Sequence, residues 1–233
     1  MLGYYDYSVI LTYCSAVSAA LGIMISLNGT GHPYLGIFFL MFSGLCDAFD
    51  GKVARTKKNR TNAEKKFGIQ IDSMSDFLAF GVLPACIGNA MMRVSPTLPE
   101  LPRFKTGTRT DFTLPILLFT ILLLYVIAAM IRLSYFNVEE EMRQTKEKGE
   151  RKVYRGLPVT SAALIFPSVL LVQYITSIDI TLVYYAVMII VGVLFISDIK
   201  IPKPGFRGIL IMVGIGLVEF ILLITLGGRG LPS

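Results

Sequence analysis

The stretch DAFDGKVAR at residues 47–55 is followed, after twelve further residues, by GIQIDSMSD at residues 68–76. Both stretches adjoin long apolar runs. Each contributes two aspartates spaced three or four residues apart, so each pair lies on one helix face. A charged side chain inside a membrane costs about 2.5–3.5 kcal/mol on insertion scales, so such a cluster needs a reason. The four aspartates are Asp47, Asp50, Asp72 and Asp76.

The composition around these acids is that of a membrane protein. Of 233 residues, 54% are hydrophobic and 16% are charged, whereas soluble domains average about 25% charged residues. A soluble single domain, a disordered chain and a secreted disulfide scaffold are therefore excluded. Because a spanning helix needs about 20 apolar residues, we predict one all-α integral membrane domain over residues 1–233. Its seven predicted transmembrane helices cover residues 8–27, 34–54, 68–92, 113–136, 156–177, 180–198 and 207–227.

The basic residues predict how the chain is oriented. The loops after the second, fourth and sixth predicted helices hold sixteen Lys and Arg residues, and the opposite side holds five. Under the positive-inside rule the sixteen lie in the cytoplasm, so the N-terminus is cytoplasmic and the C-terminus is outside. Counting helix rise from the ends of the spans places both aspartate pairs in the inner third of the cell membrane, in a site that faces the cytoplasm.

Four carboxylates at one depth repel one another unless cations neutralise them. Hard divalent ions prefer oxygen ligands, and two such ions close together can clamp a phosphate and activate an attacking oxygen. The residues alone leave two alternatives open: carboxylates bonded separately to arginine and backbone groups, or a monovalent-cation site in a transporter. A fifth acid, Glu219, is alone in the last predicted helix, where an acid most often pairs with a neighbouring helix.

Two residues beside the first aspartate pair suit a phosphate. Gly51 allows a bulky ligand to approach the backbone closely. Arg55 follows four residues later, so it lies on the same side of the helix near the membrane surface, and its guanidinium fork matches phosphate oxygens. Together with the acids, they describe a pocket for a diphosphate and metal ions.

Residues 47–76 resemble the signature of the CDP-alcohol phosphotransferase family, D-x2-D-G-x2-A-R-(x)n-G-x3-D-x3-D. All eight specified positions are present. The one departure is the gap of twelve residues between Arg55 and Gly68, which is longer than the family's usual gap, so no contact is carried over into it. The resemblance implies a homodimer with a six-helix membrane core, to which this chain adds one helix.

Three further runs resemble the phosphatidylserine synthase branch of that family. They are DSMSDFLAFGVLPA at 72–85, RLSYFN at 132–137 and YRGLP at 154–158. The resemblance covers roughly residues 8–168, and the last two predicted helices carry no recognised motif. It implies transfer of the phosphatidyl group from CDP-diacylglycerol to L-serine, giving phosphatidylserine and CMP.

The resemblance also implies roles for single residues. Two divalent ions, Mg²⁺ or Mn²⁺, are expected on the four aspartates, with Asp47 and Asp72 touching both ions and Asp76 also acting as general base. The residues expected against CDP-diacylglycerol are Gly51, Ala54, Arg55 and Thr12. A hydroxyl bonded within its own helix is the alternative for Thr12. The residues expected against serine are Arg132, Asn137 and Arg155.

Other acceptors and other classes of protein stay open. The same transfer to glycerol phosphate, inositol phosphate or another alcohol is possible, and so is an archaeal ether-lipid donor. Outside the enzymes, the rival is a cation-coupled transporter. For Arg132, the alternative to a serine contact is a side chain that reaches to the inner surface or pairs with a membrane carboxylate. We expect no nucleic-acid partner.

Overall fold

The computed structural model of the chain describes residues 3–28, 35–98, 113–146, 153–176 and 178–227. Every predicted transmembrane segment contains a helix. The long helices are α1 (Ile10–Leu27), α2 (Leu35–Thr56), α3 (Asn62–Asp76), α4 (Leu83–Val94), α5 (Thr113–Lys146), α6 (Ala162–Thr176), α7 (Thr181–Ile196) and α8 (Phe206–Gly227). Short 3-10 turns, η1 (Tyr7–Val9) and η3 (Val159–Ser161), precede α1 and α6.

Five helical stretches are long and apolar enough to cross a membrane. They are Tyr7–Leu27, Asn62–Val94, Thr113–Arg143, Val159–Thr176 and Phe206–Leu226. The apolar helix α7 is shorter, and α2 has four charged residues in its last ten. The fold is therefore that of a helical membrane protein, while the count of seven spans stays a prediction.

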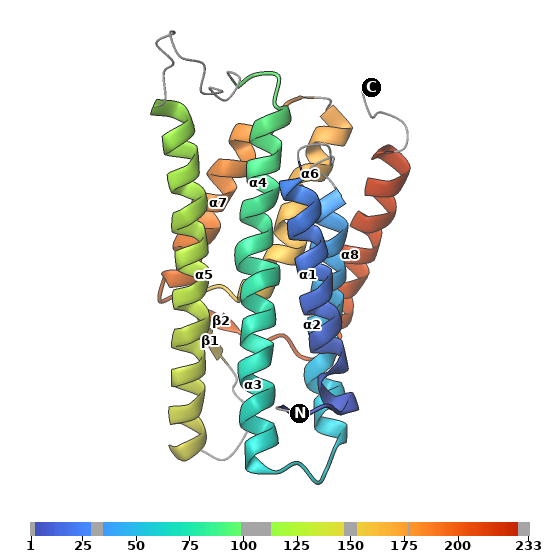
Figure 1. The fold of residues 1–233 in the computed structure, drawn as a ribbon, viewed down its shortest axis with the longest axis vertical. Coiled ribbons are helices and arrows are strands. Elements are labelled where there is room, and N and C mark those ends of the chain that lie inside the picture. The colour runs from blue at the N-terminus through green and yellow to red at the C-terminus, as the bar shows by residue number, and fades with distance from the viewer. Residues whose placement is uncertain (1–2, 29–34, 99–112, 147–152, 177, 228–233) are drawn as a thin grey trace.

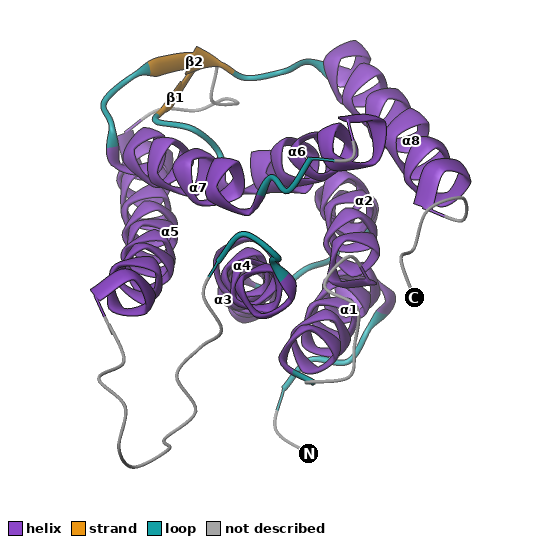
Figure 2. Ribbon diagram, turned by 90° about the horizontal axis from the view of Figure 1, so that it is seen from above, coloured by secondary structure: helices purple, strands orange, loops and turns teal. Residues whose placement is uncertain are grey.

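Helices α3 and α4 form one continuous rod through the middle of the molecule. They are joined by the π-helical segment η2 (Phe77–Val82). Seen from above, the rod lies between the α1–α2 pair on one side and α5, α6 and α7 on the other, with α8 outermost beside α6 (Figure 2). Of the five candidate spans, this rod has the largest buried share. The second aspartate pair lies at the end of α3, where the rod passes from its largely exposed first half into its buried second half.

Pro84 explains how the middle of the rod is held. Proline has no N–H, so it cannot donate to the carbonyl four residues earlier, that of Phe80. The buried Tyr125 hydroxyl of α5 donates to that carbonyl at 2.7 Å, and the Tyr184 hydroxyl of α7 donates to the Pro84 carbonyl at 2.9 Å. Because unpaired backbone groups are costly in a membrane, these two tyrosines fix the rod against its neighbours.

A two-stranded antiparallel sheet is a feature that the sequence analysis did not predict. Strand β1 (Val153–Arg155) pairs with β2 (Lys200–Pro202), so the loops after α5 and α7 are joined. Gly156 follows β1 with φ = 75°, a left-handed conformation that favours glycine, and its N–H donates to the Ile199 carbonyl at 2.7 Å. Three-residue strands leave little alternation to read in a sequence, which is why they were missed.

The two ends of the molecule carry different elements. The start of α1, the α2–α3 turn and the end of α5 lie at one end, and the end of α8 lies toward the other (Figure 1). The basic loop after α2 belongs to the first end, whereas β1 and β2, which carry described basic residues of the other two loops, lie nearer the middle (Figure 1). Several basic residues named for those loops and for the opposite side, such as Arg103, Arg109, Lys148 and Arg229, lie outside the described residues.

Two further expectations can be compared with the helices. Helix α5 runs ten residues beyond the predicted end at 136, because the charged residues that follow continue the helix. Glu219 of α8 is buried and accepts a hydrogen bond from the Ser168 hydroxyl of α6. This confirms that the lone acid pairs with a neighbouring helix.

Candidate active site

The four aspartates meet between α2 and α3. Carboxylate oxygens of Asp47, Asp50 and Asp72 lie within 4.8 Å of one another. Asp76 joins them through a side-chain contact with Asp47, and Asp72 makes one with Asp50. The predicted sharing of helix faces is therefore confirmed. The two pairs also meet each other, because α2 and α3 run antiparallel and bring them to one level.

The acid cluster fits divalent cations. None of the ion pairs found within the described ranges involves these four carboxylates. The alternative was that the acids bond separately to arginine and backbone groups, and its arginine part is thus not what the described residues show. Several carboxylate oxygens a few ångströms apart are the donor set that Mg²⁺ and Mn²⁺ prefer.

Helix α1 closes the site from a third side. The Thr12 hydroxyl donates to Asp50 at 3.3 Å, so it does not bond within its own helix. The Ser75 hydroxyl of α3 donates to the Thr12 carbonyl at 3.1 Å. Thr12 and Ser75 are both buried. They hold α1 and α3 together beside the acids, and Ser75 is a residue that the sequence analysis did not single out.

The residues expected against CDP-diacylglycerol follow the acids along α2. The exposed Arg55 side chain folds back over Gly51, with Nη1 only 3.4 Å from where a Cβ would stand on that glycine. The pair therefore lies on one side of α2, as predicted. Ala54 is partly buried one turn after Asp50. Contact of Gly51, Ala54, Arg55 and Thr12 with a nucleotide stays a prediction.

The residues expected against serine have different surroundings. Asn137 of α5 donates to the Ser73 hydroxyl at 2.7 Å, which holds it against α3 at the residue after Asp72. Arg132 is 4% exposed, and its guanidinium donates to the carbonyls of Leu157 at 3.0 Å and Gly156 at 3.4 Å. These two bonds are to the turn after β1, and the guanidinium also lies 5.6 Å from the centre of the Phe136 ring.

Arg155 lies further out on β1. Its Nε is 3.4 Å from Glu139 and 3.9 Å from Asp198, and its side chain is 49% exposed. The structure thus places Asn137 next to the acid cluster, Arg132 beneath the β1 turn, and Arg155 in a surface ion-pair network. The serine contacts themselves stay predictions.

The N-terminal segment is tied to the turn that follows α2. The Lys57 ammonium bonds Asp6 at 2.6 Å and Glu64 at 2.8 Å. The hydrogen bond from Lys57 lowers the pKa of Asp6 to about 2. Thr61 and Glu64 form a capping box that starts α3. These contacts fix the loop that connects the two halves of the signature.

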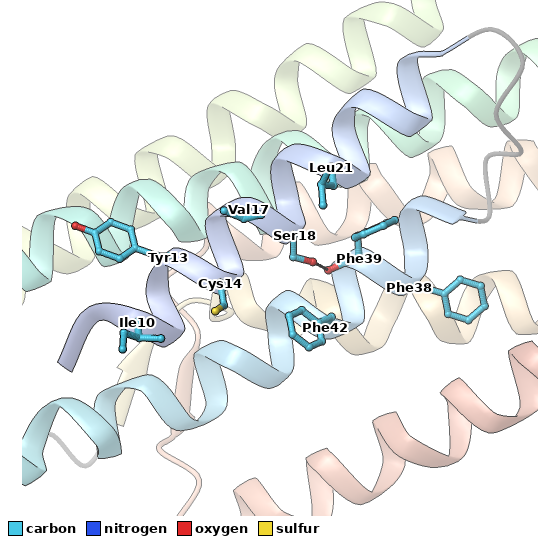
Figure 3. Close-up of a pocket in the computed structure, with 9 residues that line it drawn as sticks. All are labelled: Ile10, Tyr13, Cys14, Val17, Ser18, Leu21, Phe38, Phe39 and Phe42. Carbon is cyan, nitrogen blue, oxygen red and sulfur yellow. Dashed lines mark hydrogen bonds between the residues drawn. The ribbon is translucent and has the colours of Figure 1, made fainter. Parts of the chain in front are cut away.

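An apolar groove on the outer face of α1 and α2 is separate from the acids. Its lining includes Tyr13, Val17 and Leu21 of α1 and Phe38 and Phe42 of α2 (Figure 3). None of the predicted site residues lines it. The polar site is therefore defined by its carboxylates and not by this groove.

This fold and this acid cluster define a family. Residues 7–217 match the CDP-alcohol phosphatidyltransferase family, which is most of the chain. The chain therefore belongs to that family, and the resemblance drawn from residues 47–76 is confirmed.

Proteins similar to this chain come from distantly related organisms. The CDP-diacylglycerol–serine O-phosphatidyltransferase of Saccharomyces cerevisiae is 31% identical over 143 residues, which are 60% of this chain but 43% of the yeast protein. The protein of the same name from Helicobacter pylori is 26% identical over 81% of this chain and 70% of its own length. The archaetidylserine synthase of Methanothermobacter thermautotrophicus is 29% identical over 85% of this chain and 70% of its own length.

Proposed function

We propose that this chain transfers the phosphatidyl group of CDP-diacylglycerol to L-serine, forming phosphatidylserine and releasing CMP. The observation that carries the proposal is the cluster of four carboxylates between α2 and α3, with Arg55 folded over Gly51 one turn away. Membership of the CDP-alcohol phosphatidyltransferase family supports the reaction type. The names of the yeast and Helicobacter pylori relatives support serine as the acceptor.

The aspartates supply the charge that the reaction needs. In this proposal Asp47, Asp50, Asp72 and Asp76 hold two divalent cations, Mg²⁺ or Mn²⁺. When bound, these ions neutralise the diphosphate of the donor and the charge that develops on the leaving phosphate. Thr12 orients the Asp50 carboxylate through its hydroxyl. Arg55 and Gly51 receive the CDP moiety at the outer turn of α2.

The proton transfer is assigned to Asp76. As the serine hydroxyl oxygen bonds to the lipid-side phosphorus, its proton passes to the Asp76 carboxylate, and the bond from that phosphorus to the CMP oxygen breaks. A carboxylate at the acid cluster is within reach of an acceptor held beside it. Asn137, fixed by Ser73, and Arg132 are proposed to position the amine and carboxylate of serine. Arg155 is the second cation proposed for the serine carboxylate.

The proposed topology follows the basic loops. With seven spans and a cytoplasmic N-terminus, the acids lie in the inner third of the membrane and open to the cytoplasm, from which serine and the CDP head group arrive. The chain acts as one transmembrane domain, and we propose a homodimer. Labelling of single cysteines placed at Lys58 and at Ile178 in sealed vesicles would test the orientation, since only the first should react from the cytoplasmic side.

The decisive experiment is an acceptor panel. Purified protein is given CDP-diacylglycerol with serine, glycerol phosphate or inositol phosphate, with and without Mg²⁺ or Mn²⁺, and CMP release is measured. CMP release that requires both serine and the metal is the expected result. Equal release with another alcohol would replace the acceptor, and no release with any acceptor would favour the transporter alternative.

An ether-lipid donor is the second candidate, favoured by the similarity to the archaetidylserine synthase. In this proposal the residues that surround the acids contact the head group of the donor and do not distinguish ester from ether chains. The same panel with the ether-linked CDP lipid decides between them. A kcat/KM higher for the ether lipid would change the donor and leave the acceptor and the site unchanged.

A further inference from the structure

Arg60, in the turn between α2 and α3, lies close to the acid cluster. Its Nη1 is 3.5 Å from the Ala54 carbonyl, and its Nη2 is 3.3 Å from the Glu64 carbonyl. The same Nη2 is 2.6 Å from the position that a Cβ would take on Gly68. The guanidinium therefore spans from the end of α2 to the second turn of α3, in space that only a glycine at position 68 leaves open.

This position is in line with the aspartates on both helices. Gly68 precedes Asp72 by four residues, so the two lie on one face of α3, a turn apart. Ala54 follows Asp50 by four residues and is related to it in the same way on α2. A helical turn rises about 5.4 Å. The Arg60 guanidinium is thus about one turn from the carboxylates, toward the end of the molecule that carries the α2–α3 turn.

The contacts that Arg60 makes leave part of its guanidinium unused. Its Nε is buried, and no hydrogen-bond acceptor for it is found in the described part of the chain. Its two bonds to carbonyls are long, at 3.3 and 3.5 Å, and it forms no ion pair among the described residues. A guanidinium offers several N–H donors and matches phosphate oxygens in pairs. A partly buried cation with spare donors beside an acid cluster is suited to an anionic ligand.

We propose that Arg60 binds the diphosphate of the CDP-lipid donor and thereby sets the position of the nucleotide. The assignment rests on the proposed function. Its neighbours argue for the diphosphate over the serine carboxylate: Arg60 bonds the carbonyl of Ala54, a residue expected against the nucleotide, while Asn137, a residue expected against serine, contacts α3 from α5. Arg55 over Gly51 and Arg60 over Gly68 then form a pair of guanidiniums, one from each side of the turn.

The inference gives the long α2–α3 connection a use. Arg60 is one of the twelve residues between Arg55 and Gly68, a segment longer than the family's usual gap, to which no role could be transferred. The Thr61–Glu64 capping box starts α3 directly after it, and Lys57 ties the turn to Asp6. These contacts hold the backbone on both sides of Arg60, so that its side chain can bind without the whole loop being ordered by the ligand.

The test measures nucleotide binding without turnover. The full chain in detergent with Mn²⁺ is titrated with CDP and, separately, with cytidine, for the wild type, Arg60→Gln and Arg60→Lys. The control is Lys58→Gln, which removes an exposed cation from the same turn. We expect Arg60→Gln to weaken CDP binding about 10- to 100-fold, the range for a charge-assisted hydrogen bond. Arg60→Lys should bind CDP with an affinity between those of the wild type and Arg60→Gln. The affinities for cytidine and Mn²⁺ and the Tm should change little in both variants.

Four results would overturn the assignment. CDP affinity within about twofold of the wild type in a folded Arg60→Gln protein, much less than the loss of a charge-assisted hydrogen bond, would show that the guanidinium does not reach the phosphates. Equal losses for CDP and cytidine, or a lower Tm in both variants, would make Arg60 a structural residue of the turn. If the wild type itself bound no CDP with Mn²⁺, the proposed function would fail and the assignment with it. If the wild type and Arg60→Gln bound CDP equally well, the assignment alone would fail.

Discussion

The donor side and the acceptor side of the site differ in how the protein satisfies their charges. On the donor side, between α2 and α3, four carboxylates have no basic partner among the ion pairs of the described residues, and Arg60 has donors to spare. On the acceptor side, Arg132 is bound to two backbone carbonyls and Arg155 lies beside two carboxylates. Charges that the protein leaves unpaired indicate a ligand, whereas charges that it pairs can equally be scaffold. By this criterion the donor-side residues rank above Arg132 and Arg155 as ligand contacts.

The largest expected effect is on the donor side. Replacing any one of Asp47, Asp50, Asp72 or Asp76 by Asn should abolish measurable transfer, a loss of about a thousandfold, because the amide keeps the shape but not the charge that holds the metals. CMP release and Mn²⁺ binding are measured together. The matched control is Glu219→Gln, which changes a buried membrane acid outside the site and should keep both. Near-full turnover of Asp76→Asn at saturating metal would end its role as base.

The next largest effect is expected at Arg55, in the last turn of α2. Arg55→Ala should weaken CDP-diacylglycerol binding by about 1.5–3 kcal/mol, since one charge-assisted hydrogen bond is lost, and the serine KM should change less. The control is Lys65→Ala, an exposed cation on α3. Equal losses of affinity for the donor and for serine would place Arg55 between the two substrates. The site could then not be divided into a donor side and an acceptor side at this residue.

A smaller effect is expected at Arg132, where the comparison is most easily broken. Lysine cannot reproduce the guanidinium fork, so Arg132→Lys should raise the serine KM about tenfold, the loss of one good hydrogen bond, and leave CDP-diacylglycerol binding nearly intact. Substrate titrations and thermal unfolding check this. If the Tm falls and both substrates weaken alike, Arg132 only supports the Gly156 turn. An unchanged serine KM in a folded variant would shift attention to Arg155.

The smallest effect is expected at the ion pair between Asp6 and Lys57, the N-terminal tether. Asp6 has a pKa of about 2 in the folded protein, below its ordinary 3.8. The Asp6–Lys57 pair therefore stabilises the fold above about pH 4 and is lost only as the pH falls through about 2. Between neutral pH and about pH 5 the tether should not titrate.

Because the tether is near the surface, its loss is mild. Asp6→Asn should raise the CDP-diacylglycerol KM no more than about threefold, and high salt should produce the same rise in the wild type but not in the variant. KM at low and high salt is the measurement. A salt response that persists in Asp6→Asn would show that another charge pair causes it.

How much could be predicted from the sequence differs between the same two sides. The acid cluster was predictable because its spacing is local: three and four residues within a helix, on two helices joined by one turn. Arg55 over Gly51 follows from the same rule. Within each helix these relations depend on helix periodicity alone, and the meeting of the two pairs adds only that α2 and α3 run antiparallel.

The acceptor side depends on contacts between distant segments. Asn137 meets Ser73 across 64 residues, and Arg132 meets Leu157 through a turn that exists because β1 pairs with β2. Arg60 was missed for a third reason: its relation to Gly68 arises from a side chain that folds back along the start of α3. No spacing rule for helix faces reaches a residue in a turn, so these neighbours required coordinates.

The proline in the central rod has a consequence for how the protein is made. Pro84 cannot donate to the Phe80 carbonyl, and Tyr125 donates to that carbonyl from 45 residues later in the chain. Tyr184 donates to the Pro84 carbonyl from 100 residues later. During synthesis, the rod that carries Asp72 and Asp76 therefore enters the membrane before the helices that complete its hydrogen bonds exist. The active site is assembled late, when α7 arrives. A chain that stops before α7 should contain both aspartate pairs and yet lack a stable site for metal.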